Sequence, residues 1–233
     1  MDQGDAAQAR SRGRYLMFTG IVESLGRLAR REVIGGDAQL TIACPDLSLE
    51  DVRLGDSIAV NGVCLTVTGL SPASFDADMS VETLARTCLG ELAVGSDLNL
   101  EKALMPTSRM GGHIVTGHVD GVGEVLECEP RGRAIYYSVA AAKELLRYIA
   151  PKGSIAVDGV SLTINGVWDD RFELLVIPHT LSATTLPSYA PGRHVHLEVD
   201  IMARYAERLL QGRRTREPRG LTLEQLAEAG FLR

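Results

Sequence analysis

The sequence contains no run of about 18 consecutive apolar residues, so no segment is long enough to cross a bilayer as a helix. It contains no long run of lysine and arginine, and its formal net charge is -6, which disfavours binding to nucleic-acid phosphates. The first sixteen residues lack the apolar stretch of a secretory signal, and we expect either a flexible extension or a start codon chosen upstream of Met17. These absences predict a soluble cytoplasmic protein without membrane or nucleic-acid partners.

Cysteine and histidine are also scarce, and neither occurs in a metal-binding spacing. The four cysteines form no Cys-x-x-Cys pair, and the five histidines form no His-Glu-x-x-His motif. The sequence also lacks a P-loop, a Gly-x-Gly-x-x-Gly segment opening a helix and a Gly-x-Ser-x-Gly elbow, which disfavours nucleotide cofactors and acyl transfer. We expect no metal and no cofactor. We also expect free thiols at Cys44, Cys64, Cys88 and Cys128.

The sequence repeats itself at a fixed distance. Residues Ser57–Gly69, SIAVNGVCLTVTG, return as Ser154–Gly166, SIAVDGVSLTING, displaced by 97 residues. The same displacement relates Thr19–Val22 to Thr116–Val119 without a gap. Because a chance motif would not keep its distance to several other motifs, the chain is a tandem duplication. A repeat of this length suits a small domain with its own core rather than one unit of a solenoid.

We therefore expect two similar domains followed by a C-terminal segment. The domains span about 17–102 and 114–200, and residues 201–233 form a helical segment suited to oligomerisation. Alternation of apolar and polar residues, with the turns Asn61-Gly62 and Asp158-Gly159, indicates antiparallel strands. Because about 85 residues cannot cover two open sheet edges, each set of strands closes into a small barrel. The predicted fold class is all-β with short helices.

Short helices are expected at a few places. One spans Ala140–Ile149, and a weaker one is expected at the equivalent Pro45–Val52. Another follows the second domain, where an apolar stripe packs either on a partner subunit or back on its own chain. A short helix with a capping box is expected over 222–230. The members of the stripe are Met202, Tyr205, Ala206 and Leu209.

Two strands carry a small polar residue at equivalent positions. Cys64 and Ser161 are each followed two residues later by a threonine, Thr66 or Thr163, on the same face of the strand. Each pair offers a nucleophilic or hydrogen-bonding atom beside a hydroxyl group. The alternative is that both are small residues filling a barrel interior, but the duplication of the polar pair favours a site.

The histidines give a further candidate. His118 aligns with the Gly20–Val22 segment of the first repeat, which favours a functional role for it over one for the neighbouring His113. His194 and His196 lie two residues apart on one face of a predicted strand. We expect this second pair to be structural or solvated.

Five segments form a specific combination. They are MFTGIVE at Met17–Glu23, NGVCLTVT at Asn61–Thr68, GGHIVTGHVDGVG at Gly111–Gly123, KGSIAVDGVSLTI at Lys152–Ile164 and the Ile177–Leu181 stretch. Over about residues 17–210 the chain resembles the riboflavin synthase family of the alpha-chain type. It departs from that family in its leader, in its C-terminal tail and in Thr116, where many relatives have Gln.

The resemblance implies an enzyme that converts two molecules of 6,7-dimethyl-8-ribityllumazine into riboflavin and 5-amino-6-(ribitylamino)pyrimidinedione. A four-carbon unit moves between the two molecules without a cofactor. It also implies a homotrimer of chains with two six-stranded antiparallel Greek-key β-barrels plus a C-terminal helix. Each site would lie between the first barrel of one subunit and the second barrel of its neighbour. Association with lumazine synthase is a further possible partnership, and it stays open.

The same resemblance carries over two lumazine pockets and a catalytic set. The first pocket would contain Gly20, Ile21, Val22, Ser57, Cys64, Leu65, Thr66, Asp78, Met79, Ser80, Val81, Glu82 and Thr83. The second would contain Gly117, His118, Val119, Lys152, Ser161, Leu162, Thr163, Ile177, Pro178, His179, Thr180, Leu181 and Ser182. The catalytic set would be Phe18, Cys64, His118, Ser161 and Asp200. Which pocket holds the donor and which the acceptor stays open.

Two other functions compete with this interpretation. A lumazine or flavin carrier of the same superfamily would keep the barrels but lose reactive side chains in one repeat. This chain retains all of them, namely Cys64, His118, Lys152, Ser161 and Asp200. A flavin-dependent reductase on a similar barrel would need a nicotinamide site, and no signature for one is present. The enzyme interpretation is therefore favoured.

Overall fold

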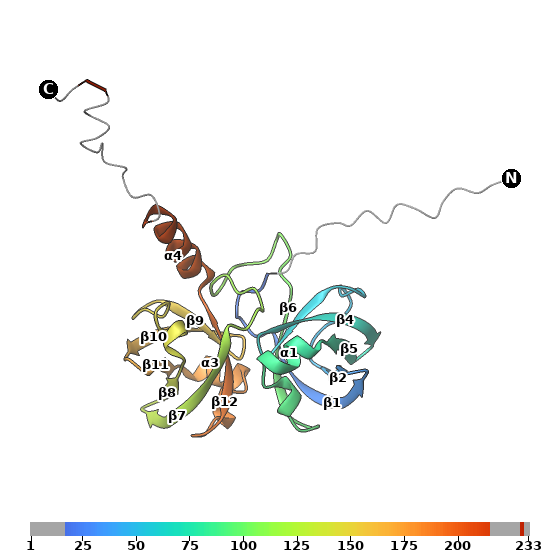
Figure 1. Cartoon of the computed structure of the whole chain (residues 1–233). Coiled ribbons are helices and arrows are strands. Elements are labelled where there is room, and N and C mark those ends of the chain that lie inside the picture. Colours follow the sequence, from blue (N-terminus) through green and yellow to red (C-terminus); the bar gives the residue numbers. More distant parts are fainter. Residues whose placement is uncertain (1–16, 215–228, 231–233) are drawn as a thin grey trace. The chain divides into compact units, whose positions relative to one another are not determined.

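The computed structural model describes residues 17–214 and 229–230 (Figure 1). Contacts divide the chain into a unit that ends at Asp200 and a C-terminal unit that begins at Ile201. The predicted leader and most of the helix predicted over 222–230 lie outside the described residues. Within the described part, no helix is both long enough and apolar enough to span a lipid bilayer.

The first six strands close into an antiparallel barrel in the order β1-β2-β5-β4-β3-β6. Strands β3, β4 and β5 form consecutive hairpins and β2 lies beside β5, which is Greek-key connectivity. Two short helical elements, α1 (Val81–Arg86) and η1 (Leu89–Glu91), connect β5 to β6. The strands are β1 (Ser24–Ile34), β2 (Asp37–Ala43), β3 (Ser57–Val60), β4 (Val63–Ser71), β5 (Ser74–Met79) and β6 (Asp97–Lys102).

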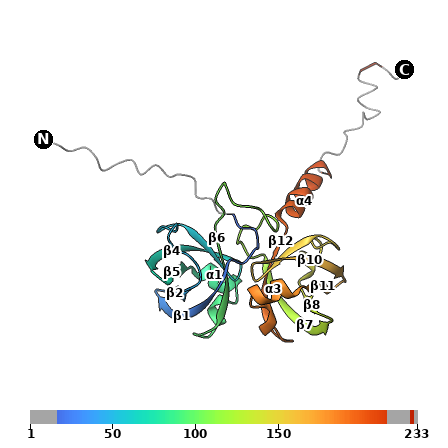
Figure 2. The same ribbon diagram turned by 180° about the vertical axis from the view of Figure 1, so that it is seen from behind.

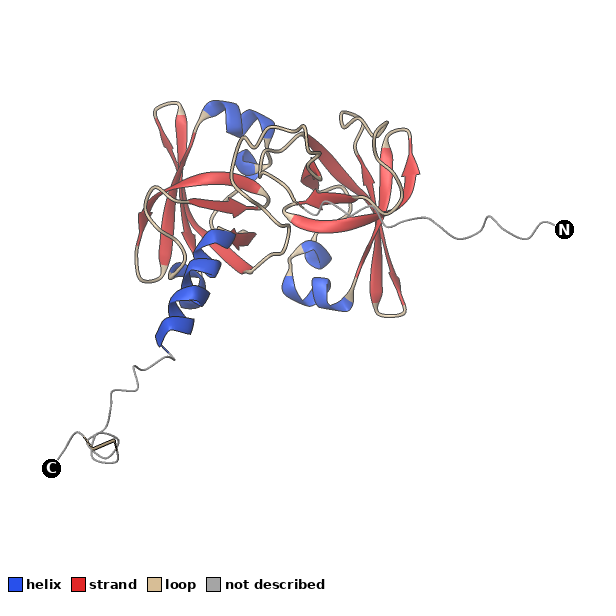
Figure 3. Ribbon diagram, turned by 90° about the horizontal axis from the view of Figure 1, so that it is seen from above, coloured by secondary structure: helices blue, strands red, loops and turns tan. Residues whose placement is uncertain are grey.

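The second six strands repeat this arrangement with the same neighbours, and Figure 3 shows the two groups of strands as separate barrels. The strands are β7 (Gly121–Arg131), β8 (Ala134–Ala140), β9 (Ser154–Val157), β10 (Val160–Val167), β11 (Arg171–Val176) and β12 (His194–Val199). The helical elements are α2 (Lys143–Leu146), α3 (Pro178–Ala183) and η2 (Leu186–Ser188). The predicted pair of six-stranded barrels is confirmed.

Alternation along each strand separates the barrel interior from its outer face. In β4 the side chains of Val63, Leu65 and Val67 are buried in the core of the first barrel, and the intervening side chains point outward. Strand β10 has the same burial pattern in the second barrel. Cys64 and Ser161 therefore lie on outer faces, and the alternative that they fill the barrel interiors is wrong.

The helices within the barrels are shorter than the sequence predicts. The helix expected over Ala140–Ile149 is reduced to the four residues of α2 and is followed by turns. The stretch Pro45–Val52 contains turns and no helix. The reason is local, because Pro45, Asp46 and Asp51 favour turns and compete with helical hydrogen bonding.

The C-terminal unit contains the predicted helix, α4 (Ile201–Arg214). Its apolar stripe is solvent-exposed in the single chain, with exposed fractions of 62% for Tyr205 and 73% for Leu209. Burial of this apolar stripe of α4 against another protein surface would contribute hydrophobic stabilisation to that contact.

Hydrogen bonds between the two barrels follow the repeat. Asn99 of β6 accepts the backbone N–H of Thr185 through Oδ1, at 2.9 Å. At the equivalent position of β12, His196 accepts the backbone N–H of Cys88 through Nε2, at 2.8 Å. The Nδ1 atom of His196 lies 2.8 Å from the carbonyl oxygen of Asn61, so the ring is neutral with its proton on Nδ1. His196 has the structural role that the sequence predicts.

These bonds also place the short helices at the junction. In the views of Figure 1 and Figure 2, α1 and α3 lie on the sides of their barrels that face the other barrel. Each element that follows these helices then meets a strand of the opposite barrel.

Candidate active site

The segments that precede the two barrels are exchanged between them. The carbonyl oxygen of Gly20 accepts the backbone N–H of Ser161 in β10, at 2.7 Å. The carbonyl oxygen of Gly117 accepts the backbone N–H of Cys64 in β4, at 2.9 Å. The loop of each repeat therefore lies against the strand of the other repeat.

This exchange corrects the grouping of the two expected pockets. Gly20–Val22 was expected beside Cys64 but lies beside Ser161, and the reverse holds for Gly117–Val119. Packing agrees, because Val22 contacts the core of the second barrel and Val119 contacts the core of the first. A constant displacement shows which residues are equivalent, but it does not show which barrel each of them joins. We call the two assemblies the Cys64 half-site and the Ser161 half-site.

Phe18 joins the two exchanged segments. Its backbone N–H donates to the carbonyl oxygen of Val115 at 2.7 Å, and its own carbonyl accepts the N–H of Val115 at 3.1 Å. Its ring is fully buried in a cluster with Ala59, Val115 and Ala156. A Cβ atom placed on Gly117 would lie 2.9 Å from Cε2 of this ring. Phe18 therefore supports the site by packing behind the Gly117 loop.

A buried carboxylate holds the loop of the Ser161 half-site. Oε1 of Glu101 accepts the backbone N–H of Thr19 at 2.6 Å and its hydroxyl at 2.8 Å, and Oε2 accepts the N–H of Gly20 at 2.9 Å. Burial raises the pKa of Glu101 to about 7, against the lowering effect of these three bonds, and the charge of Glu23 adds to the rise. A pocket of about 230 Å³ opens beside Glu101, and Ile21 is the one predicted binding residue that lines it.

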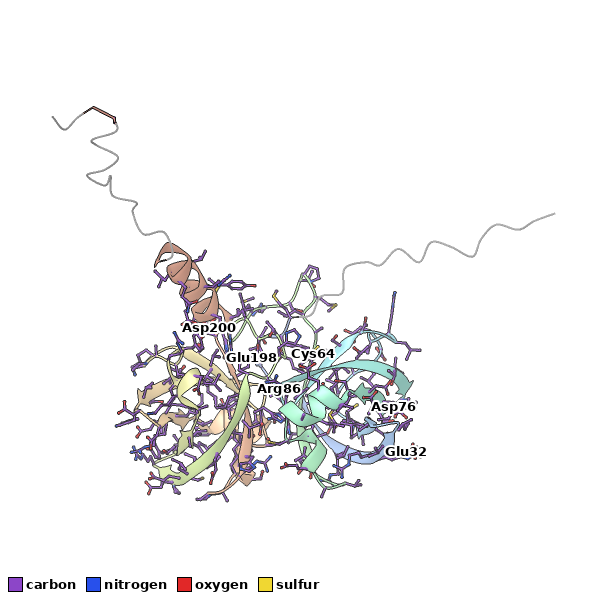
Figure 4. The ribbon with its side chains drawn as sticks, viewed as in Figure 1. Glu32, Cys64, Asp76, Arg86, Glu198 and Asp200 are labelled. Atoms are coloured by element: carbon purple, nitrogen blue, oxygen red, sulfur yellow. The ribbon has the colours of Figure 1, made fainter. Side chains whose placement is uncertain are left out.

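Glu198 holds the loop of the Cys64 half-site in the same way. Its Oε1 accepts the backbone N–H and the hydroxyl of Thr116, at 2.6 and 2.7 Å, and its Oε2 accepts the N–H of Gly117 at 2.9 Å. Burial raises the pKa of Glu198 as well. Gly117 thus connects the carboxylate to Cys64, and Figure 4 shows Cys64 and Glu198 between the barrels.

The Cys64 half-site has polar groups on the outer face of the barrel. Thr66 lies two residues after Cys64 and pairs directly with Asp78 on β5. Burial, followed by the charge of Glu198, raises the pKa of the Cys64 thiol, and a hydrogen bond with Ser57 partly offsets the rise. A neutral thiol is a weak nucleophile, so Cys64 is suited to hydrogen bonding rather than to covalent attack.

The Ser161 half-site contains a histidine that the sequence did not favour. Nδ1 of His113 lies 2.7 Å from the hydroxyl oxygen of Ser161, and the backbone N–H of His113 donates to the carbonyl of Thr19 at 3.1 Å. Nε2 of His113 is buried and has no hydrogen-bond partner in the described part of the chain. Burial lowers the pKa of His113 and the charge of Asp200 opposes this, so the ring is neutral at neutral pH and can exchange a proton with Ser161.

Repeat comparison misses His113 because its counterpart is Leu16, which lies outside the described residues and carries no polar atom in its side chain. A signal was nevertheless present in Gly112. A Cβ atom at this position would lie 2.8 Å from the Cβ and the hydroxyl oxygen of Ser161. The glycine pair before His113 therefore marks a close approach of this loop to β10.

The remaining predicted residues are divided between the surface and the core. Ser80 caps α1, and its hydroxyl accepts the backbone N–H of Thr83 at 3.2 Å. Val81 and Ile177, beside the starts of α1 and α3, are each 58% exposed. Three others face the barrel interiors and can offer only backbone atoms, namely Leu65, Met79 and Leu162.

Helix α3 begins differently, because its N-cap residue Ile177 makes no side-chain capping bond. Pro178 lies in its first turn, and Ser182 donates its hydroxyl to the carbonyl of His179 at 2.8 Å. His118 and Lys152 are exposed, and the backbone N–H of His118 donates to the hydroxyl of Thr116 at 3.4 Å. The structure therefore brings Cys64 and Ser161 against the two exchanged loops, whereas Ser80 and Ser182 lie at the short helices α1 and α3.

Known proteins share this architecture. The lumazine binding domain family matches the chain twice, over residues 19–103 and 116–200. Among solved structures, LumP complexed with 6,7-dimethyl-8-(1'-D-ribityl) lumazine is 27% identical, with a TM-score of 0.71, and the match covers 78% of this chain and 98% of that one. LumP complexed with riboflavin gives a TM-score of 0.72 at the same identity and coverage.

Curated relatives are more similar in sequence. The riboflavin synthase of Photobacterium phosphoreum is 46% identical over 217 residues, covering 93% of this chain and 100% of that protein. The riboflavin synthase of Actinobacillus pleuropneumoniae is 47% identical over 92% of this chain and 100% of its own length. That of Mycobacterium tuberculosis is 48% identical over 84% and 98%. With two lumazine binding domains and this similarity over nearly its whole length, the chain belongs to the riboflavin synthase family.

Proposed function

We propose that the chain catalyses the dismutation of two 6,7-dimethyl-8-ribityllumazine molecules to riboflavin and 5-amino-6-(ribitylamino)pyrimidinedione. The observation that carries this proposal is the presence of two equivalent half-sites in one chain, each with a carboxylate-held loop against a strand that bears Cys64 or Ser161. The reaction uses two identical molecules, so it needs two similar places. The two products together contain the atoms of two substrate molecules, so no oxidant, reductant or cofactor is required.

The two half-sites carry different polar side chains, and such a difference can assign the donor and acceptor roles of the reaction. One lumazine donates four carbons and the other accepts them, and two identical pockets could not assign these roles. The Ser161 half-site has a hydroxyl paired with the neutral ring of His113, which is suited to moving a proton. The Cys64 half-site has a neutral thiol beside the exposed His118. Backbone N–H and C=O groups and the threonine hydroxyls are suited to holding the pyrimidinedione and the ribityl chain.

A homotrimer, with each reacting pair bound between two subunits, is part of the proposal. It is supported by apolar side chains that are exposed in the single chain, namely Ile21 of the Gly20–Val22 loop and Val81 and Ile177 at the starts of α1 and α3. The exposed stripe of α4 supplies a second surface for assembly. Cytoplasmic localisation is proposed with it, supported by the free thiols of Cys44, Cys64, Cys88 and Cys128.

One experiment separates an enzyme from a carrier. The purified protein is mixed with 6,7-dimethyl-8-ribityllumazine alone, and the flavin absorbance is followed. We expect riboflavin to form, with half a mole produced for each mole of lumazine consumed. Saturable binding without flavin formation would instead establish a lumazine- or flavin-binding protein without turnover, and LumP is a structural neighbour that has been crystallised with both ligands.

A further inference from the structure

Three side chains with metal-binding atoms meet at the junction of the two barrels. Cys88 and Glu91 belong to the segment between α1 and β6, and His194 begins β12. The sulfur atom, a carboxylate oxygen and an imidazole nitrogen all lie within 4.8 Å of one another. None of the three belongs to either half-site. Sequence spacing does not reveal the group, because His194 lies about a hundred residues beyond Cys88.

The backbone holds these residues in position. Cys88 is the N-cap of η1 and Glu91 is its last residue, three positions later, which places both side chains on one face of a 3-10 turn. The N–H of Cys88 donates to Nε2 of His196, at 2.8 Å. His196 lies two residues after His194 and therefore on the same face of β12. One part-buried hydrogen bond thus sets the Cys88 side chain beside His194.

The donor set matches one cation better than others. We propose that Cys88, Glu91 and His194 form a binding site for Zn²⁺, with a water molecule as the fourth ligand. Thiolate, imidazole and carboxylate are the zinc ligands of proteins, at about 2.0 to 2.3 Å from the metal, which places tetrahedral ligand atoms about 3.2 to 3.8 Å apart. Because the three atoms lie within 4.8 Å of one another, the closure required is at most about 1.6 Å. Glu91 and His194 are exposed and are free to rotate by that amount.

Electrostatics around the thiol also favour a cation. The negatively charged side chains of Asp158 and Glu91 both act on the part-buried thiol of Cys88. The guanidinium of Arg193 opposes them with a smaller effect. The group therefore lies in a negative potential, and a divalent cation can take the place of the thiol proton.

The repeat provides an internal comparison. The positions equivalent to Cys88, Glu91 and His194 are Thr185, Ser188 and Asp97. This second set has no thiol and no imidazole, and Asp97 is engaged by Arg27 at 2.9 Å. The fold therefore does not require Cys88, Glu91 and His194, since the equivalent positions of the repeat are filled by residues of other types. The comparison also supplies Cys88→Thr as a variant whose new residue the same backbone already accepts.

The test uses the full-length, reduced protein. Zinc is titrated calorimetrically, and Co²⁺ is added as a spectroscopic probe of thiolate ligation. We expect one Zn²⁺ per chain, a thiolate-to-cobalt charge-transfer band and a higher thermal unfolding temperature with zinc, because the ion links the two barrels. Cys88→Thr and His194→Asn should each weaken binding at least tenfold and abolish the cobalt band. Cys128→Ser, which removes a different thiol, should leave the zinc affinity and the cobalt band unchanged.

A second measurement does not depend on any variant. Zinc should slow alkylation of Cys88 in the wild-type chain at least tenfold, as mapped by mass spectrometry, and should leave Cys128 unaffected. The proposal is overturned if Cys88 alkylates at the same rate with and without saturating zinc. It is also overturned if Cys88→Thr, shown to be folded by circular dichroism, binds zinc as tightly as the wild type.

Discussion

Lys152 adopts a φ of 67°, and Gly55, at the equivalent position of the first repeat, has a φ of 90°. The first barrel thus uses the residue that favours this conformation, whereas the second barrel has a long cationic side chain there. Both residues donate their N–H to a backbone carbonyl, Gly55 to Val67 of β4 and Lys152 to Ile164 of β10, at 2.8 Å in each case. The backbone requirement is the same at both positions, so Lys152 places a cationic side chain there at a cost in conformational strain that Gly55 avoids.

Replacing Lys152 should change the free energy of unfolding and the lumazine affinity in opposite directions. Lys152→Gly is expected to raise the free energy of unfolding by about 1 kcal/mol, because the left-handed conformation no longer opposes a Cβ atom. It should weaken lumazine binding at the Ser161 half-site, because a cation near the ligand is lost. Urea unfolding and calorimetric titration measure the two effects. Lys152→Asn, which tolerates positive φ and also lacks the charge, should match the binding loss, and unchanged affinity in both variants would contradict the assignment.

The loop exchange predicts a steric limit at Gly20. It has a φ of 74°, and an added Cβ atom would lie 2.7 Å from both the Cβ and the nitrogen of Ser161. Gly20→Ala should therefore destabilise the protein by about 2 to 4 kcal/mol, through backbone strain and overpacking together. Gly132, with a φ of 66° and no atom within 4 Å, is the matched control. Gly132→Ala should cost only the strain of about 1 kcal/mol, and equal shifts in the two urea midpoints would exclude close packing at Gly20.

The extent to which the sequence predicts this molecule differs between the fold and the site. Alternation places side chains correctly along β4, because a strand repeats every two residues whatever lies around it. The duplication likewise predicts that Glu101 and Glu198 are equivalent. It does not predict that Gly20 contacts Ser161 rather than Cys64, because exchange depends on how the two barrels meet. His113 was missed for a different reason, since its role follows from a contact with Ser161, 48 residues away, and its counterpart Leu16 has no polar side chain.

Glu101 makes folding depend on pH. Its pKa is about 7 in the folded chain, compared with the ordinary value of 4.5. The folded state therefore holds more protons than the unfolded state between these values, so this group's contribution is fully present below pH 4.5 and is lost as pH rises through 7. Relative to Glu101→Gln, the wild type should lose stability, by up to about 3 kcal/mol, across that window. Unfolding curves at several pH values test this.

The control for this pH effect is Glu32→Gln, because Figure 4 places Glu32 on the outer side of the first barrel, where it pairs with Arg30 at the surface. The free energy of unfolding of Glu32→Gln should change with pH in the same way as that of the wild type. A constant difference between the wild type and Glu101→Gln from pH 4.5 to 8 would show that Glu101 keeps the same protonation in both states.

The ring of His196 should be replaceable only by a group with similar hydrogen bonds. His196→Phe leaves the N–H of Cys88 and the carbonyl of Asn61 without partners in a buried junction, which should cost about 2 to 5 kcal/mol. His196→Asn introduces the residue that the first barrel uses at the equivalent Asn99, and it should recover at least half of that loss. Thermal unfolding compares the three proteins. Equal destabilisation by both substitutions would mean that ring volume, not hydrogen bonding, holds the junction.

The contact between Ser161 and His113 should control turnover rather than affinity. The hydroxyl and Nδ1 lie 2.7 Å apart, the imidazole is neutral because burial lowers its pKa, and a positioned acid or base contributes about 10² to 10⁴ in rate. Ser161→Ala and His113→Gln are each expected to lower single-turnover rates by about 10² or more, with a change in lumazine affinity below about fivefold.

Non-additivity distinguishes a cooperating pair from two independent contacts. The double variant Ser161→Ala/His113→Gln should be about as slow as either single variant, because each removes the same proton transfer. Thr163→Ala, two residues from Ser161 on the same strand face, is the control and should weaken binding while leaving the bound rate within about threefold. Multiplicative losses in the double variant would show that the two side chains act separately, and the Ser161 half-site would then have no proton-transfer pair.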